Sequence, residues 1–167
     1  MTRSLLLLAC ALALISCGRH SPQDRYAEGR EAERKGDLAA AARAYKDAVG
    51  ASTETAYAES CQFRLAHMYL VPEGDKHLAA AEQARFYRLF PASKDAPGML
   101  FLAAFTYNND LHQTDSARAL YGAFLERYPD HDLAGSARYE LQNLGKSADE
   151  LLTRADSSAS PAKALPR

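Results

Sequence analysis

The sequence is informative first for what it has little of. It contains no tryptophan, three cysteines among 167 residues, and nearly equal numbers of basic and acidic residues, 20 and 21. This charge balance argues against a nucleic-acid partner and against electrostatic attachment to an anionic membrane. The longest apolar run, Leu5–Ile15, is well short of the roughly 20 residues that a membrane-spanning helix needs. Runs of valine, isoleucine and threonine are scarce and alanine is abundant, so the composition predicts helices rather than strands.

The N-terminal segment has the organisation of a secretory signal. One basic residue, Arg3, precedes the apolar run, which leads into the sequence LISC at residues 14–17. This order resembles the signal of bacterial lipoproteins; an ordinary signal peptide with a coincidental cysteine is the alternative. The resemblance implies that residues 1–16 are a lipoprotein signal peptide, that Cys17 is lipidated, and that residues 17–22 form a tether.

The lipid that this resemblance implies would hold an otherwise water-soluble domain at a membrane. Lipoproteins of this family carry three acyl chains, and each buried CH₂ contributes about 0.8 kcal/mol. The next residue, Gly18, is not the aspartate that retains enterobacterial relatives in the inner membrane. The resemblance therefore predicts attachment to the outer membrane with the domain facing the periplasm, and leaves inner-membrane retention and surface exposure as alternatives.

The cysteine content predicts a domain without a disulfide. Cys10 would leave with the signal and Cys17 would be occupied by lipid, so Cys61 has no partner in the chain. Because Cys61 lies at helical spacing from Ala58 and Leu65, we expect a buried thiol, with a reactive thiol as the alternative.

Removal of the signal leaves 151 residues, enough for one domain, and their pattern is helical throughout. Seven helices ending near glycine, asparagine or proline are expected at 22–35, 37–50, 53–71, 75–90, 94–109, 113–128 and 131–144. An eighth, at 147–155, would begin with a capping box formed by Ser147 and Glu150. We expect a helical domain at 23–155 and a disordered tail at 156–167.

Two of the expected helices share one pattern of small and aromatic residues. The matching positions are Ala41, Tyr45 and Ala48 in one helix, and Ala117, Tyr121 and Phe124 in the other. Pro91 and Pro129, each preceded by an aromatic residue, lie 38 residues apart. These features resemble the tetratricopeptide repeat, in which small residues let paired helices approach and an aromatic fills the gap between repeats. The resemblance implies an all-α solenoid of antiparallel helix pairs, with seven to eight helices.

The second repeat departs from the pattern. Gln83 stands where the interlocking aromatic belongs, and the period is 38 rather than 34 residues. The segment 71–73 looks like the insertion responsible, so we expect a longer turn at 71–76. Together, the signal and the repeats resemble the tetratricopeptide lipoproteins of Gram-negative envelopes. Two groups are similar: the lipoprotein subunit of the β-barrel assembly machinery, and the protein that coordinates Tol-Pal with wall synthesis.

The sequence offers no motif for catalysis or metal binding, so we expect neither an enzyme nor a cofactor. It contains no HExxH, no GxSxG and no glycine-rich phosphate loop. Asp130, His131 and Asp132 open a helix, and we expect the aspartates to cap it rather than to bind a metal. The charge run at 28–35 is expected to form ion pairs along a surface helix. An enzyme whose site has no local motif remains a remote alternative.

Function is therefore expected on a surface, the concave groove that the first helices of the pairs would line. Counting from the small-residue position places eight residues on it: Arg30, Glu33, Phe63, His67, Leu70, Phe101, Phe105 and Asn108. For Phe101 and Phe105 simple packing is the alternative, and His67 is more typical of a half-buried polar residue than of a ligand. The expected occupant is an extended peptide or a helix of a partner protein.

The resulting hypothesis is a scaffold that is anchored to the membrane through its N-terminal lipid and binds a protein partner in the cell envelope. Outer-membrane protein assembly is one process in which it would act. The alternative is an organiser associated with peptidoglycan or Tol-Pal. Repeat scaffolds share core residues and differ on their surfaces, so the sequence does not name the partner.

Overall fold

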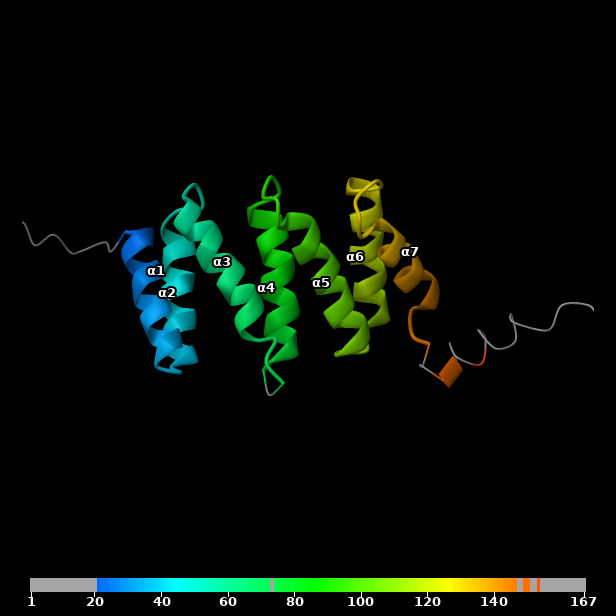
Figure 1. The fold of residues 1–167 in the computed structure, drawn as a ribbon, viewed down its shortest axis with the longest axis horizontal. Helices are drawn as coiled ribbons and strands as arrows, with labels where there is room; N and C mark the ends of the chain where they lie inside the picture. Colours follow the sequence, from blue (N-terminus) through cyan, green and yellow to red (C-terminus); the bar gives the residue numbers. More distant parts are fainter. Residues whose placement is uncertain (1–20, 73, 147–148, 151–152, 154–167) are drawn as a thin grey trace, which may run out of the picture.

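The computed structural model describes residues 21–72, 74–146, 149–150 and 153, and all regular structure in this part of the chain is helical. In this described part, seven helices follow one another (Figure 1): α1 (Pro22–Arg34), α2 (Leu38–Ala51), α3 (Ala56–Met68), α4 (Lys76–Leu89), α5 (Ala96–Asn109), α6 (Thr114–Arg127) and α7 (Ala134–Asn143). The expected all-α fold is confirmed, and each of these helices lies close to its predicted bounds.

Some of the expectations fall outside the described residues. These are the signal peptide at 1–16, the lipidated Cys17, most of the helix expected at 147–155, and the tail at 156–167. Of the tether expected at 17–22, the last two residues already belong to the start of α1. Ser21 is the N-cap of this helix and Pro22 its first residue.

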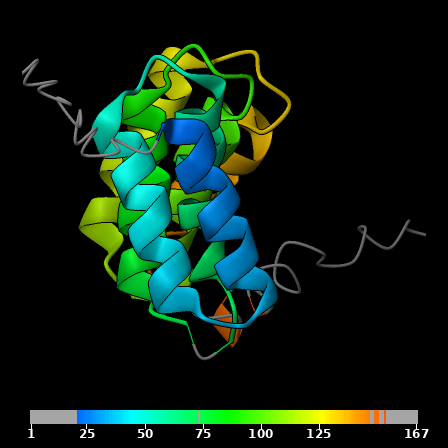
Figure 2. The same cartoon turned by 90° about the vertical axis from the view of Figure 1, so that its left-hand side faces the viewer.

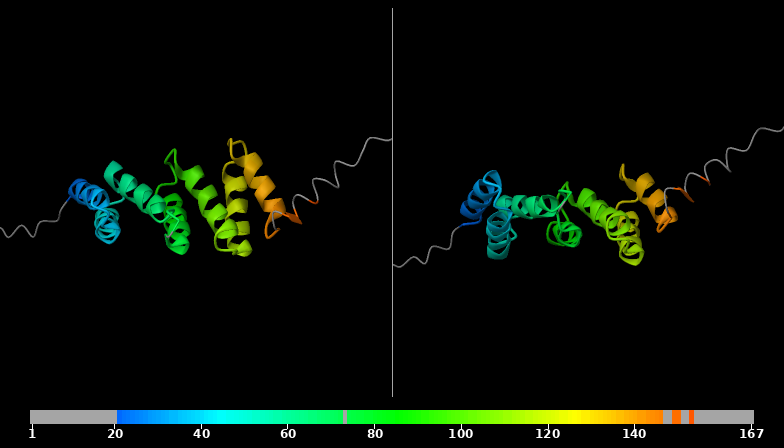
Figure 3. Two further views of the ribbon diagram at one scale, coloured as in Figure 1. Left: turned by 60° about the horizontal axis from the view of Figure 1, so that its bottom comes forward. Right: turned by 90° about the horizontal axis from the view of Figure 1, so that it is seen from below.

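The helices stand side by side in a row, and consecutive helices run in opposite directions (Figure 1). Each packs against its neighbours in the chain, and α1 also contacts α3. Viewed end-on, α1 and α2 lie in front with the later helices stacked behind them (Figure 2). Viewed from below, α1, α3, α5 and α7 lie on one side of the row and α2, α4 and α6 on the other (Figure 3). This arrangement is consistent with a stack of helical hairpins.

The second helices of the pairs recur at intervals of 38 residues. Helices α2, α4 and α6 begin at residues 38, 76 and 114, and each has 14 residues. Equivalent positions are buried to the same extent, all at 0 % exposure: Ala41, Ala79 and Ala117; Tyr45, Gln83 and Tyr121; Ala48, Phe86 and Phe124. The expected 38-residue period is therefore a property of the packed structure, and Gln83 occupies the interlocking position.

Aromatic contacts repeat with the same period. In the second and third hairpins, a ring on the first helix lies edge-on to a ring on the second helix, with centroids 6.0 Å apart: Phe63 with Phe86, and Phe101 with Phe124. The second-helix ring then lies 5.5 Å from the aromatic residue before the proline: Phe86 from Phe90, and Phe124 from Tyr128. The residues that end one hairpin thus help to form the core shared with the next.

Local sequence sets the helix ends. At the starts of α1 to α4 the side chain of the N-cap residue accepts a hydrogen bond from the backbone N–H three residues later: Ser21, Asp37, Thr55 and Asp75. After α1, Gly36 adopts a φ of 77°, a left-handed conformation that favours glycine. The capping expected of Asp130 and Asp132 is wrong. Helix α7 begins at Ala134, and His131 Nδ1 instead accepts from the Leu133 N–H at 3.1 Å.

The second hairpin is irregular, as expected. Its connection spans residues 69–75, whereas the first hairpin is joined by 35–37. At the interlocking position, Gln83 Oε1 accepts from the Thr106 hydroxyl at 3.2 Å, and Gln83 Nε2 donates to the Ala66 carbonyl at 3.5 Å. A buried amide needs such partners because burying it unpaired costs free energy. Hydrogen bonds to α3 and α5 therefore replace the aromatic packing found in the other two hairpins.

Cys61 is free and fully buried, so the expectation of a core thiol is confirmed. Burial raises its pKa to about 12. The thiol is therefore protonated at neutral pH and acts as a small apolar side chain.

Gly29 sits where α1 and α2 come closest. It is buried, and a Cβ at this position would overlap the ring of Tyr45. Because Tyr45 is itself fully buried, the ring has no open space into which to move. We expect Gly29→Ala to lower the free energy of unfolding by about 1–3 kcal/mol, measured by urea denaturation.

Gly122→Ala in α6 is the matched control, because nothing lies within 4 Å of a Cβ there. Alanine is the better helix former, so this variant is expected to gain up to about 1 kcal/mol. Equal stability of the two variants would contradict the close approach at Gly29.

Candidate functional site

One aromatic side chain occupies an equivalent place on the first helix of every hairpin and on α7. These residues, spaced by 37 or 38 positions, are Tyr26, Phe63, Phe101 and Tyr139. The rings of Tyr26 and Phe101 lie 6.2 and 5.5 Å from the interlocking tyrosines of their own hairpins. Unlike the interlocking rings, the four remain partly open to solvent, and Tyr139 is 56 % exposed. We call the surface of α1, α3, α5 and α7 that carries them the first-helix face.

The residue one turn after each of these aromatics varies from hairpin to hairpin. It is Arg30, His67, Phe105 or Asn143. The ring of His67 is tilted by 31° to that of Phe63, with centroids 4.3 Å apart, and the ring of Phe105 stacks on that of Phe101 at 6.4 Å. Each helix of the first-helix face therefore carries an aromatic residue at the equivalent position. The residue one turn later differs in chemistry from helix to helix.

Four of the predicted groove residues form one contacting pair on α1 and one on α3. They are Arg30, Glu33, Phe63 and His67. An ion pair joins the two helices here, because Arg64 Nη1 lies 2.8 Å from Glu33 Oε2, and Arg30 Nε approaches the same oxygen at 3.8 Å. The Glu33 carboxylate is therefore already paired. The expected ion pairs of the charge run are also present, among them Glu31 with Arg34 and Lys35.

The other predicted residues are separated from this group. Phe101 packs on Tyr121 and Phe124, whereas Phe105 is 39 % exposed. Leu70 lies beyond the end of α3, and its carbonyl accepts a hydrogen bond from Lys76 Nζ at 3.2 Å.

Asn108 lies beside α7. Burial raises the pKa of the Glu140 carboxyl above its ordinary value, and the nearby Asn108 side chain acts against that shift. Asn108 on α5 is therefore close to Glu140 on α7.

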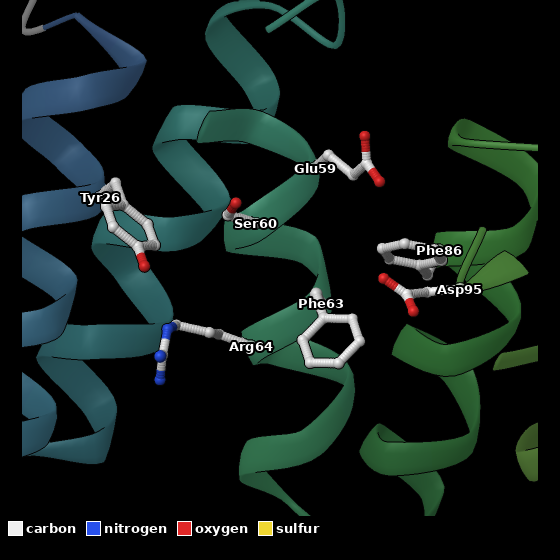
Figure 4. A pocket seen from close by; sticks show the side chains of 7 residues that line it. All are labelled: Tyr26, Glu59, Ser60, Phe63, Arg64, Phe86 and Asp95. Atoms are coloured by element: carbon white, nitrogen blue, oxygen red, sulfur yellow. The ribbon is translucent and has the colours of Figure 1, made fainter. Parts of the chain in front are cut away.

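A pocket of about 220 Å³ lies along α3, between α1 and the start of α5 (Figure 4). It is lined by Tyr26, Glu59, Ser60, Phe63, Arg64, Phe86 and Asp95. Tyr26 and Arg64 lie on one side, and Glu59, Phe86 and Asp95 on the other (Figure 4). The sequence reasoning identified only Phe63 among these residues.

The helical spacing of Glu59, Ser60, Phe63 and Arg64 on α3 was a signal that could have marked this face. Only the stacking of hairpins brings Tyr26 and Asp95 to it.

The two carboxylates of the pocket are placed by the connection between α4 and α5. The Ser93 hydroxyl donates to Glu59 Oε1 at 2.7 Å, and the Asp95 N–H donates to the Ser93 hydroxyl oxygen at 3.1 Å. Asp95 is the N-cap residue of α5, yet its side chain makes no capping hydrogen bond. Its carboxylate is thus left available at the pocket.

The strongest pKa increases in the described part belong to core groups rather than to this pocket. Burial raises the pKa of Tyr45, Cys61 and Tyr121, all of which are fully buried. Among residues 21–72, 74–146, 149–150 and 153, no three His, Cys, Asp or Glu side chains are arranged to hold a metal ion. Within the same ranges, no helix has the length and apolar character needed to cross a membrane. No protein-family model matches the chain, and no curated protein matches it.

Proposed function

We propose that this protein is a scaffold of the bacterial cell envelope, anchored by lipid on Cys17, that binds a segment of a partner protein on its first-helix face. The 38-residue repetition of helices, burial and aromatic contacts supports the resemblance to tetratricopeptide lipoproteins. The LISC sequence at 14–17 supports the lipid anchor. Attachment to the outer membrane, with the domain in the periplasm, follows from the resemblance at Gly18.

The observation that carries the proposal is the row of incompletely covered aromatics. Interlocking and second-helix aromatics such as Tyr45, Phe86 and Phe124 are fully buried. The first-helix aromatics occupy equally regular positions but stay open, and Phe105 and Tyr139 are more than a third exposed. Aromatic side chains are enriched among the residues that dominate protein–protein binding. A bound peptide or helix lying across α1, α3, α5 and α7 would cover them.

Binding, rather than catalysis, is the activity that this chemistry favours. The groups with the strongest increases in pKa are packed in the core, whereas catalytic groups with shifted pKa values must reach a substrate. We place the scaffold in outer-membrane protein assembly, and its alternative is an organiser associated with Tol-Pal or peptidoglycan. Copurification with barrel-assembly components or with Tol-Pal components distinguishes the two.

Phe105→Ala is expected to weaken partner binding by about 2 kcal/mol, or roughly 30-fold, because an exposed aromatic anchor would be lost. The partner is first identified as the envelope protein that cross-links to the tagged wild-type chain. Its affinity is then measured for the wild type and for each variant, together with the thermal midpoint of each chain. Phe105 is 39 % exposed, so its removal should lower the midpoint only slightly.

The control for this substitution is Arg118→Ala, at an exposed position of α6 on the other side of the row. It should leave both binding and midpoint unchanged. A large fall in the midpoint of Phe105→Ala, with full binding by the fraction that stays folded, would show that Phe105 is a core residue and not part of the binding face.

A further inference from the structure

We infer that the pocket along α3, between α1 and the start of α5, receives a single lysine or arginine side chain of the bound segment, held between the Glu59 and Asp95 carboxylates and the aromatic walls. This inference rests on the proposed function and names the chemistry of the partner at one point of the same face. Its evidence is the size of the pocket, the charges at its rim and the rings that line it.

The size of the pocket suits one side chain. Sites for whole small molecules commonly measure about 300–1,000 Å³, whereas this pocket measures about 220 Å³. It opens on the same face as the aromatic row, since Tyr26 and Phe63 belong to both. A peptide that crosses the row can therefore insert one residue here while its backbone stays outside.

The rim carries negative charge that the described residues leave uncompensated. The Glu59 carboxylate is oriented by the Ser93 hydroxyl, which is neutral. Within the described part of the chain, the Asp95 side chain makes no hydrogen bond and no ion pair. Its neighbour Lys94 is exposed and has no ion pair there either. An incoming cation would gain two carboxylates without displacing an existing partner.

The positive residue of the pocket does not neutralise this rim. Arg64 lies on the opposite side of the pocket, beside Tyr26, and is paired with Glu33 at 2.8 Å (Figure 4). Because this ion pair joins α3 to α1, the positive charge of Arg64 is balanced by Glu33 and not by the rim carboxylates. The carboxylates of Glu59 and Asp95 therefore favour a positively charged side chain in the pocket.

The rings explain why the guest is a long basic side chain rather than a small cation. Lysine and arginine bury an apolar stem while the charged head stays near polar groups. A cation over the face of tyrosine or phenylalanine is also attracted by the ring. Phe63 supplies such a ring, and Phe86 adds an apolar wall. The apolar stem of the basic side chain would thus pack on the rings, and its charged head would lie near the carboxylates.

The test is selection of random 12-residue peptides displayed on phage, using the full chain purified in detergent. The selection is run on the wild type, on the double variant Glu59→Gln/Asp95→Asn, and on a control, Asp115→Asn/Glu126→Gln, whose exposed carboxylates lie on α6. Glutamine at 59 still accepts from Ser93, so the fold of the pocket is kept. We expect the peptides selected by the wild type and the control to share one basic position that the double variant does not select.

A synthetic peptide from the selection then gives the size of the effect. Replacing its basic residue by glutamine, or using Glu59→Gln/Asp95→Asn, should each weaken binding about tenfold, and the two changes together should add little further. Peptides that bind the first-helix face but share no basic position would overturn this inference and leave the proposed function standing. Peptides that share an acidic position would do the same and would assign the pocket to Arg64. Failure to select any peptide would overturn both.

Discussion

Truncation of Tyr121 to alanine is expected to lower the free energy of unfolding by about 3–5 kcal/mol. Tyr121 is fully buried on α6, its ring centroid lies 5.5 Å from that of Phe101 on α5, and it belongs to a cluster that includes Ala137 on α7. The cluster to which it belongs thus joins α5, α6 and α7. Its removal leaves a cavity that the surrounding helices can fill only partly, since each is fixed by its own neighbours.

Two further variants test whether the loss of stability comes from lost packing of the Tyr121 ring, rather than from its hydroxyl or from the loss of any tyrosine. The Tyr121 hydroxyl is buried and has no hydrogen-bond partner in the described part of the chain, so Tyr121→Phe is expected to change stability by less than about 1 kcal/mol. Tyr139→Ala removes a tyrosine that is 56 % exposed and should cost about 0.5 kcal/mol or less. Urea denaturation followed by circular dichroism measures all three. A tolerated Tyr121→Ala would mean that the hairpins do not interlock through this ring.

The second large effect is expected at Cys17. If the proposed anchor is correct, the mature wild-type chain begins at Cys17 and carries acyl chains, each buried CH₂ adding about 0.8 kcal/mol of membrane affinity. Cys17→Ala should then abolish acylation and processing and yield a chain that retains residues 1–16. Intact mass is the decisive measurement, because an unprocessed apolar run at 5–15 can itself retain some protein in the membrane fraction.

The matched control is Cys10→Ala, which removes a cysteine from the segment that the proposal assigns to the signal. Its mature mass should equal that of the wild type. A Cys17→Ala chain of the same processed mass as the wild type, apart from the substitution, and still anchored to the membrane, would contradict lipidation at Cys17.

The sequence predicted the helices and their period because both depend on local patterns. Alanines that permit close approach, the tyrosines at the interlocking position, and the prolines that follow α4 and α6 all recur at fixed spacing. Gln83 was recognised as a departure, but its partners were not. They lie 17 and 23 residues away, at Ala66 and Thr106, and only the packing of α3, α4 and α5 brings them together.

The candidate site was predicted less completely, for the same reason. Positions on one helix could be counted, which placed Phe63 and His67 together. The pocket also depends on Tyr26 from another hairpin and on Asp95, which sequence rules treat as a capping residue. Asp95 makes no capping bond, and this local exception leaves its carboxylate at the pocket.

The proposal that partners bind the first-helix face is tested most directly by photo-cross-linking in living cells. Benzoylphenylalanine is placed one position at a time at Phe105 and Tyr139, which are exposed on that face, and at Ala119 and Glu126, which are exposed on α6. We predict that the same envelope protein cross-links from both positions of the first-helix face and from neither position on α6. Cross-links that arise equally from α6, or from α6 alone, would contradict the account.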